Sequence, residues 1–126
     1  MVVTHVANWF AGWGMILAAF LTGGAIGLFF HREQFWGGYA SFRRRIVRLG
    51  HIALAALGMI NLLFAISVPR QNQLTHLASI LLIVGAISMP AVCFLSGWKK
   101  AFRHLFFIPV LSLVVAVILI LAGGLP

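Results

Sequence analysis

Residues 102–123 read FRHLFFIPVLSLVVAVILILAG, and the part from Ile108 to Ala122 consists almost entirely of Leu, Ile and Val. An α-helix rises about 1.5 Å per residue, so about 20 apolar residues are needed to cross a hydrocarbon core roughly 30 Å thick. The segment is therefore predicted to span a membrane. Because it carries no polar stripe, we expect it to face lipid or an apolar partner.

Three earlier stretches satisfy the same length criterion. The four expected spans cover residues 8–30, 46–68, 74–96 and 102–123. The links between the last three spans are short, which favours antiparallel neighbours. The sequence thus predicts an all-α integral membrane protein with four transmembrane helices in an up-down-up-down bundle, and a single domain over residues 1–126.

The composition excludes a soluble protein. Hydrophobic residues make up 63% of the chain and charged residues 8%, with a mean hydropathy of +1.10, whereas a soluble domain is about 25% charged. The only acidic residue is Glu33, so the chain itself offers neither paired-carboxylate hydrolysis nor a carboxylate proton relay. The single cysteine, Cys93, excludes an internal disulfide. We therefore expect no catalytic residues, no metal site and no enzyme activity.

Basic residues lie almost entirely on one side of the expected topology. The first and third links, with their edges, carry all the basic residues except Arg70, which lies in the second link. Basic loops are retained in the cytoplasm, so both termini are expected on the non-cytoplasmic side of a bacterial inner membrane. Residues 1–7 carry no basic residue, so we expect the first span to be kept rather than cleaved as a signal peptide. The net charge of +8 has no base-reading motif beside it, and no nucleic-acid partner is expected.

The first link, residues 31–45, is expected to lie along the membrane interface, because it combines aromatic side chains with polar residues. Ser41 is expected to cap a helix that begins before the membrane. Membrane lipid is an expected partner, since basic groups are attracted to anionic headgroups. The side chains expected to contact lipid or an acidic partner are Arg43, Arg44, Arg45, Arg48, Lys99, Lys100 and Arg103.

Small and polar residues within the spans predict helix packing. Ala19, Gly23 and Gly27 lie four residues apart on one face of the first span, a spacing that lets two helix backbones approach closely. The partner of this face is either a helix of the same chain or another subunit. Asn61 lies near the middle of the second span and needs a hydrogen-bond partner, for which we expect Ser79, Ser88 or a neighbouring subunit.

Histidines are the candidate cofactor ligands. His51 and His104 are expected at one depth on the inner side, and His76 and His5 on the outer side, so that each pair could hold haem b or a chlorophyll-type pigment. Beside His51, the small residues Ala55 and Gly58 are expected to leave room for a flat macrocycle. The alternative for each histidine is a structural role or contact with lipid headgroups.

Three functions are compatible with these features. The first is a small accessory subunit of a larger membrane complex, of the energy-transducing type (electron-transfer or photosynthetic), that acts through contacts with other transmembrane subunits and lipid. The second is a haem- or pigment-binding protein that uses His51 and His104. The third is a carrier of a small solute or metal. The first is favoured because the chain lacks catalytic pairs and carboxylates but has small-residue faces for neighbours.

Overall fold

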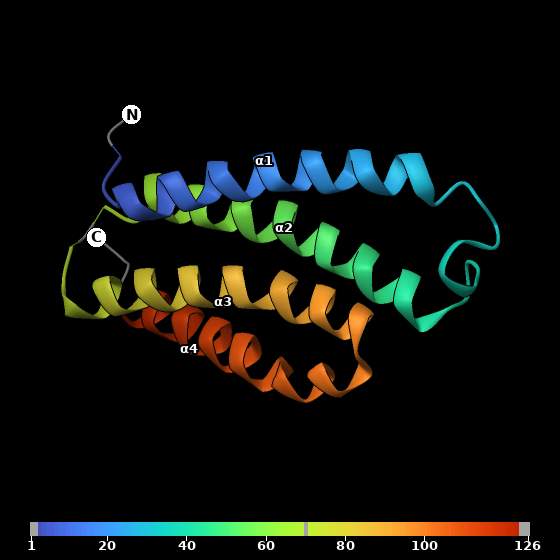
Figure 1. Cartoon of the computed structure of the whole chain (residues 1–126). Helices are drawn as coiled ribbons and strands as arrows, with labels where there is room; N and C mark the ends of the chain where they lie inside the picture. Colours follow the sequence, from blue (N-terminus) through green and yellow to red (C-terminus); the bar gives the residue numbers. More distant parts are fainter. Residues whose placement is uncertain (1–2, 70, 124–126) are drawn as a thin grey trace.

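Four long helices follow one another along the chain, and successive helices run in opposite directions (Figure 1). They are α1 (Val6–Phe29), α2 (Phe42–Ser67), α3 (Gln73–Trp98) and α4 (Phe107–Gly123). The computed structural model describes residues 3–69 and 71–123. Helices α1, α2 and α3 and the segment Lys100–Gly123 are long and apolar enough to cross a membrane. The predicted all-α membrane protein with four spanning helices is therefore confirmed.

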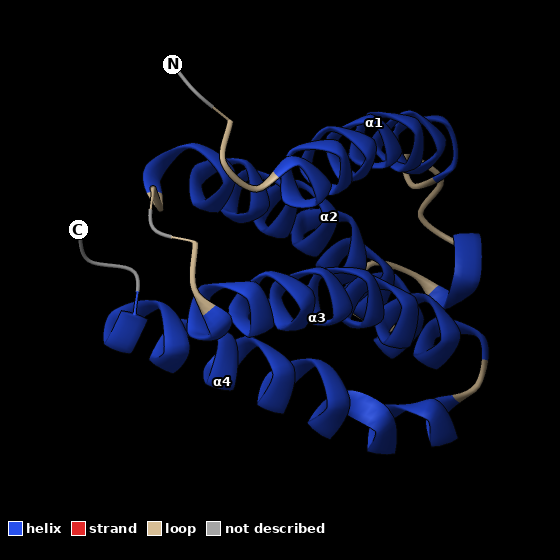
Figure 2. Ribbon diagram, turned by 90° about the vertical axis from the view of Figure 1, so that its left-hand side faces the viewer, coloured by secondary structure: helices blue, strands red, loops and turns tan. Residues whose placement is uncertain are grey.

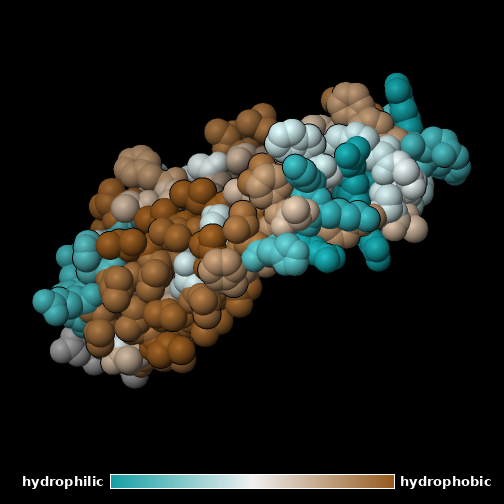
Figure 3. Space-filling model, turned by 60° about the horizontal axis from the view of Figure 1, so that its bottom comes forward, coloured by the Kyte–Doolittle hydropathy of each residue, from teal (hydrophilic) through white to brown (hydrophobic). Residues whose placement is uncertain are grey.

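The helices stand in a curved row in chain order. Helix α1 packs on α2, α2 on α3 and α3 on α4, so α1 and α4 lie at opposite edges (Figure 2). One buried cluster joins α1 to α2 and α3, and it includes Met15, Leu54 and Ala86. A second joins α2, α3 and α4 through Phe64 and Leu82, among others. The face of the molecule seen in Figure 3 carries a broad hydrophobic area, with hydrophilic residues gathered toward its two ends.

Helix α2 begins four residues earlier than the predicted second span. The Ser41 hydroxyl accepts a hydrogen bond from the Arg44 backbone N–H at 3.2 Å, which confirms the expected N-cap. Phe42 to Arg45 are therefore helical, and the expected interfacial link over residues 31–45 is correspondingly shorter. Within that link, a short 3₁₀ turn, η1 (Phe35–Gly37), contains Trp36 at a φ of 52°, and the positive φ values of Gly37 and Gly38 complete the reversal.

The predicted fourth span is divided into two kinds of helix. Residues Lys100–Phe106 form a 3₁₀-helix, η2, before α4 begins at Phe107. Pro109 explains the boundary, because its ring nitrogen cannot donate to the Leu105 carbonyl four residues earlier. Proline is tolerated in the first turn of a helix, where Pro109 lies. The two links that carry the basic residues meet at one end of the molecule (Figure 1), and Arg70 lies outside the described residues.

Candidate functional site

Arg44 is buried at the basic end of the molecule, whereas the sequence predicted that it would contact lipid or a partner. Its guanidinium lies 4.7 Å from the ring centre of Tyr39 and 5.1 Å from that of Phe30, and it donates to the Arg32 carbonyl. The side chain is 0% exposed, and neither Nε nor Nη1 has a hydrogen-bond partner among the described residues. Cation–π contact with desolvated rings stabilises such a cation, so Arg44 holds the link against α2 and does not reach headgroups.

Arg43, one residue earlier, joins α2 to the end of α3. Its Nε donates to the Gly97 carbonyl at 2.7 Å, and its guanidinium carbon lies 5.5 Å from the Trp36 ring centre. Gly97 has to be small, because a Cβ there would come within 2.8 Å of Val47 Cγ2. The other six basic residues predicted to contact lipid or a partner stay exposed, as such a contact requires: Arg43, Arg45, Arg48, Lys99, Lys100 and Arg103.

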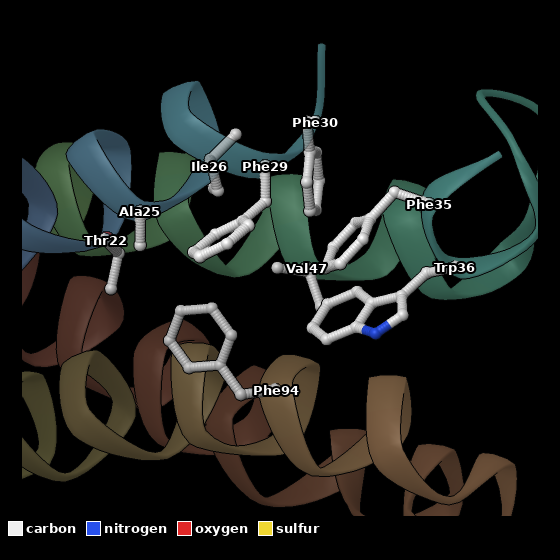
Figure 4. Close-up of a pocket in the computed structure, with 9 residues that line it drawn as sticks. All are labelled: Thr22, Ala25, Ile26, Phe29, Phe30, Phe35, Trp36, Val47 and Phe94. Atoms are coloured by element: carbon white, nitrogen blue, oxygen red, sulfur yellow. The ribbon is translucent and has the colours of Figure 1, made fainter. Parts of the chain in front are cut away.

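An apolar cavity of about 320 Å³ lies between α1, α2, α3 and the first link (Figure 4). Phe94 of α3 faces the rings of Phe29, Phe35 and Trp36 across it, and Thr22 marks its deepest level. Two further cavities lie toward the basic end, of about 300 and 330 Å³. The residues that line them include Arg43 and Trp98 in both cases. The basic end therefore holds cavities with aromatic walls beside exposed cations.

His51 is used for packing between helices. The Thr22 hydroxyl oxygen lies 2.9 Å from the Ala18 carbonyl oxygen and 3.0 Å from Nδ1 of His51, and the tautomer of His51 decides which group donates in the second bond. The ring lies so close to α1 that a Cβ on Gly23 would be 2.9 Å from its Cε1. The space expected for a macrocycle is filled by α1, because a Cβ on Gly58 would be 2.9 Å from the Gly12 carbonyl oxygen. The expectation of room beside Ala55 and Gly58 was therefore wrong.

The structure does not bring His51 to His104. His51 faces α1, whereas His104 is exposed on η2, which packs on α3 and α4. Haem or pigment binding by these residues stays a prediction.

The other two candidate ligands do meet. His5 and His76 line one cavity of about 220 Å³ at the end opposite the basic links. His5 Nε2 is buried without a hydrogen-bond partner among the described residues, and its ring centre lies 4.4 Å from that of Phe64. Burial lowers the pKa of His5 below its usual value, with a smaller contribution from the charge of His76 and an opposing one from the Val68 backbone. No group of three or more potential metal ligands converges among the described residues.

A buried polar network crosses the bundle below this cavity. Asn8 Nδ2 donates to Asn61 Oδ1 at 2.8 Å and to the Ser79 carbonyl at 3.3 Å, and the Ser79 hydroxyl donates to Asn8 Oδ1. Asn61 Nδ2 donates to the Leu57 carbonyl at 2.9 Å. The expected link from Asn61 to Ser79 therefore runs through Asn8, which the sequence reasoning missed. Asn8 shares a helix face with Gly12, Met15 and Ala19, a pattern that could have revealed it.

The predicted small-residue face of α1 is divided between two uses. Ala19 is buried in the core and Gly23 contacts His51, so both serve packing within the chain. A Cβ on Gly27 would meet no atom within 4 Å. Comparison with family models, with curated proteins and with solved structures finds no match for this chain.

Proposed function

We propose that this chain is a small accessory subunit that packs against other transmembrane proteins within a larger membrane complex. The support is one face of α1, which has the spacing of a helix-packing seam but points away from α2. We call it the α1 outer face, and its residues alternate at intervals of four and three: Phe10, Gly14, Leu17, Leu21, Gly24 and Leu28. Residues at this spacing form one stripe along a helix.

The α1 outer face offers both projections and gaps. Its four large side chains are exposed, Leu28 by 69% and Leu17 by 60%. A Cβ on Gly14 or Gly24 would meet no atom within 4 Å, so neither glycine is required by packing within the described chain. A glycine in the middle of a helix costs about 1 kcal/mol relative to alanine, and in membranes small residues are used where a second helix approaches closely. A docked helix accounts for both glycines.

The uneven burial of the four helices favours the same function. In the most apolar part of each span, 44% of residues are buried in α2 and in α3, but only 17% in α1 and 11% in the fourth. Of the two edge helices, α1 packs mainly on α2 with a smaller contact with α3, and α4 packs mainly on α3. Partner helices beside α1 and α4 would give them the burial that the inner helices already have.

Photo-crosslinking tests the proposed contact. A photoreactive residue at Leu21 is expected to cross-link to a second transmembrane protein in intact membranes. Gly24→Leu is expected to remove this cross-link, because the added side chain fills the gap and its Cβ would meet no atom of the described chain within 4 Å. Ala56→Leu, on an exposed part of α2, is the matched control. A probe that labels only lipid, or labelling that survives Gly24→Leu, would contradict the proposal.

We further propose that the basic end faces the cytoplasm of a bacterial inner membrane and that both termini face outward. Support comes from the grouping of the basic links at one end, which is the distribution that retains loops inside. In intact spheroplasts, an external protease should remove a terminal tag and leave the first link uncut. Cleavage of the link with protection of the tag would reverse the orientation. An energy-transducing host stays a prediction from the sequence.

A further inference from the structure

Three cavities at the basic end adjoin one another and share lining residues. Trp36, Val47 and Phe94 line both the apolar cavity and its neighbour. Arg43 and Trp98 line both that neighbour and the third cavity. We call this row of adjoining cavities the amphipathic groove, and its lining residues extend from Lys100 at the basic end to Thr22 inside the bundle.

The groove is polar at one end and apolar at the other. Thr22 hydrogen-bonds His51, which follows Arg43 by eight residues on α2. At about 1.5 Å per residue, the deep end therefore lies about 12 Å further into the membrane than Arg43. The residues around the deep end are aliphatic and aromatic apart from Thr22 (Figure 4), and the Thr22 hydroxyl is already bonded to the Ala18 carbonyl.

The shallow end holds two cations and an unpartnered hydroxyl. Arg43 is fixed by its bond to the Gly97 carbonyl, and Lys100 Nζ lies 5.5 Å from the Phe42 ring centre. Ser96 lines the same cavity, is only 1% exposed, and its Oγ has no hydrogen-bond partner among the described residues. The described residues that line this cavity include no carboxylate. Two cations and a free hydroxyl donor around one cavity are complementary to an anion with several acceptor oxygens.

We propose that the amphipathic groove binds an anionic phospholipid, with the phosphate at Arg43, Lys100 and Ser96 and one acyl chain along Phe94 toward Thr22. The order of the two ends matches a lipid in the cytoplasmic leaflet, where anionic lipids attract basic side chains at the membrane surface. An acyl chain in the groove and an acyl chain in the bilayer have equally apolar surroundings, so the acyl chain gains little free energy by entering the groove. The headgroup therefore decides which lipid is selected.

Lipid retention by the full-length protein tests the site. The protein is reconstituted with equal amounts of dioleoylphosphatidylglycerol and dioleoylphosphatidylcholine, extracted in mild detergent at about 0.5 M salt, and analysed by native mass spectrometry. High salt screens the electrostatic attraction between exposed charges that lie more than a few ångströms apart. Lipid that stays bound at this salt concentration therefore reports a specific contact. We expect the purified protein to retain the anionic lipid in preference to the zwitterionic one.

Two double variants with equal charge loss separate the groove from the general surface. Arg43→Gln with Lys100→Gln should lower anionic lipid retention about tenfold or more, since each basic group contributes about a fivefold factor. Arg45→Gln with Lys99→Gln removes two charges that lie outside the groove and should leave retention near that of the wild type. Equal losses in both variants, or loss in neither, would overturn the proposal.

Two single variants keep the test decisive if the loss of Arg43 disturbs the fold. Ser96→Ala removes only the buried hydroxyl and should weaken retention of the anionic lipid. Ala25→Trp fills the deep end and should displace the acyl chain, whereas binding of phosphate alone would be unaffected. Retention unchanged by both variants, or competition by inorganic phosphate as strong as that by lipid, would overturn the acyl-chain assignment. If the protein retains the anionic lipid but the probe on α1 cross-links to no second protein, only the accessory-subunit function is contradicted.

Discussion

Asn8 Nδ2 donates to Asn61 Oδ1 over 2.8 Å, and both side chains are fully buried. This bond joins α1 to α2, and the bonds between Asn8 and Ser79 extend the connection to α3. In a membrane interior an unpaired amide is costly. The three polar residues therefore fix the depth at which three helices meet.

Removing Asn8 should cost more stability than removing Asn61. Asn8→Ala leaves Asn61 Oδ1 and the Ser79 hydroxyl without this partner, and we expect a loss of about 2 kcal/mol in the free energy of unfolding. Asn61→Ala leaves Asn8 bonded to Ser79 and should cost less. Reversible unfolding in mixed detergent and SDS micelles measures both, and the double variant gives the coupling energy. Additive losses would show that the bond has no net effect.

Gly23→Ala and Gly24→Ala should have opposite effects on stability. The new Cβ at position 23 would lie 2.9 Å from His51 Cε1, whereas at position 24 it would meet no atom within 4 Å. We expect Gly23→Ala to destabilise by about 1–3 kcal/mol and Gly24→Ala to be neutral or stabilising. Thermal unfolding in detergent measures the difference. The loss at Gly23 should largely disappear in a His51→Ala background, and its persistence there would contradict the proposed clash.

Acidification should destabilise the end of the bundle where His5 lies. The folded state lowers the pKa of His5, so the unfolded chain binds a proton at a higher pH than the folded chain. The contribution of neutral His5 to the free energy of unfolding is fully present above the ordinary imidazole pKa of 6.5. It is lost as the pH falls from that value toward the lower pKa that His5 has in the folded protein. His5→Leu should flatten this dependence in unfolding measurements between pH 8 and 5. A variant with the same pH profile as the wild type would assign the effect to another group.

Loss of the Arg44 side chain should loosen the first link. The rings of Phe30, Phe35 and Tyr39 surround its guanidinium, and a desolvated cation–π contact contributes up to about 2 kcal/mol. Arg44→Ala should therefore speed chymotrypsin cleavage between residues 30 and 39 by at least about tenfold. Arg45→Ala removes an exposed neighbour of the same type and serves as the control. Equal cleavage rates in the two variants would show that Arg44 does not hold the link.

The four spans could be predicted because hydropathy and length suffice for them. The helix boundaries were harder to predict, since each depends on a single capping contact or on the backbone N–H donor that a proline lacks. Ser41 was recognisable as an N-cap because its residue type has that preference. The division of the last span at Phe107 depends on Pro109, which looked like a residue within a helix and instead lies in its first turn.

The site was less predictable, because burial is decided between helices. Arg44 looked like its neighbours Arg43 and Arg45, and only the position of the aromatic link distinguishes it. His51 has small residues on its own face, but the sequence cannot show that α1 fills the space beside them. The amphipathic groove combines residues from α1, α2, α3 and the link, so no local pattern contains it.

The row order of the helices also bears on how the protein is made. Each helix after α1 packs on the helix synthesised just before it, so the chain can complete one hairpin after another as it is made from its amino end. Domains and local elements generally form in this direction during synthesis. The contacts of α1 with α3, among them the bonds between Asn8 and Ser79, must wait until the third helix leaves the translocon, so this junction forms after the first hairpin is complete.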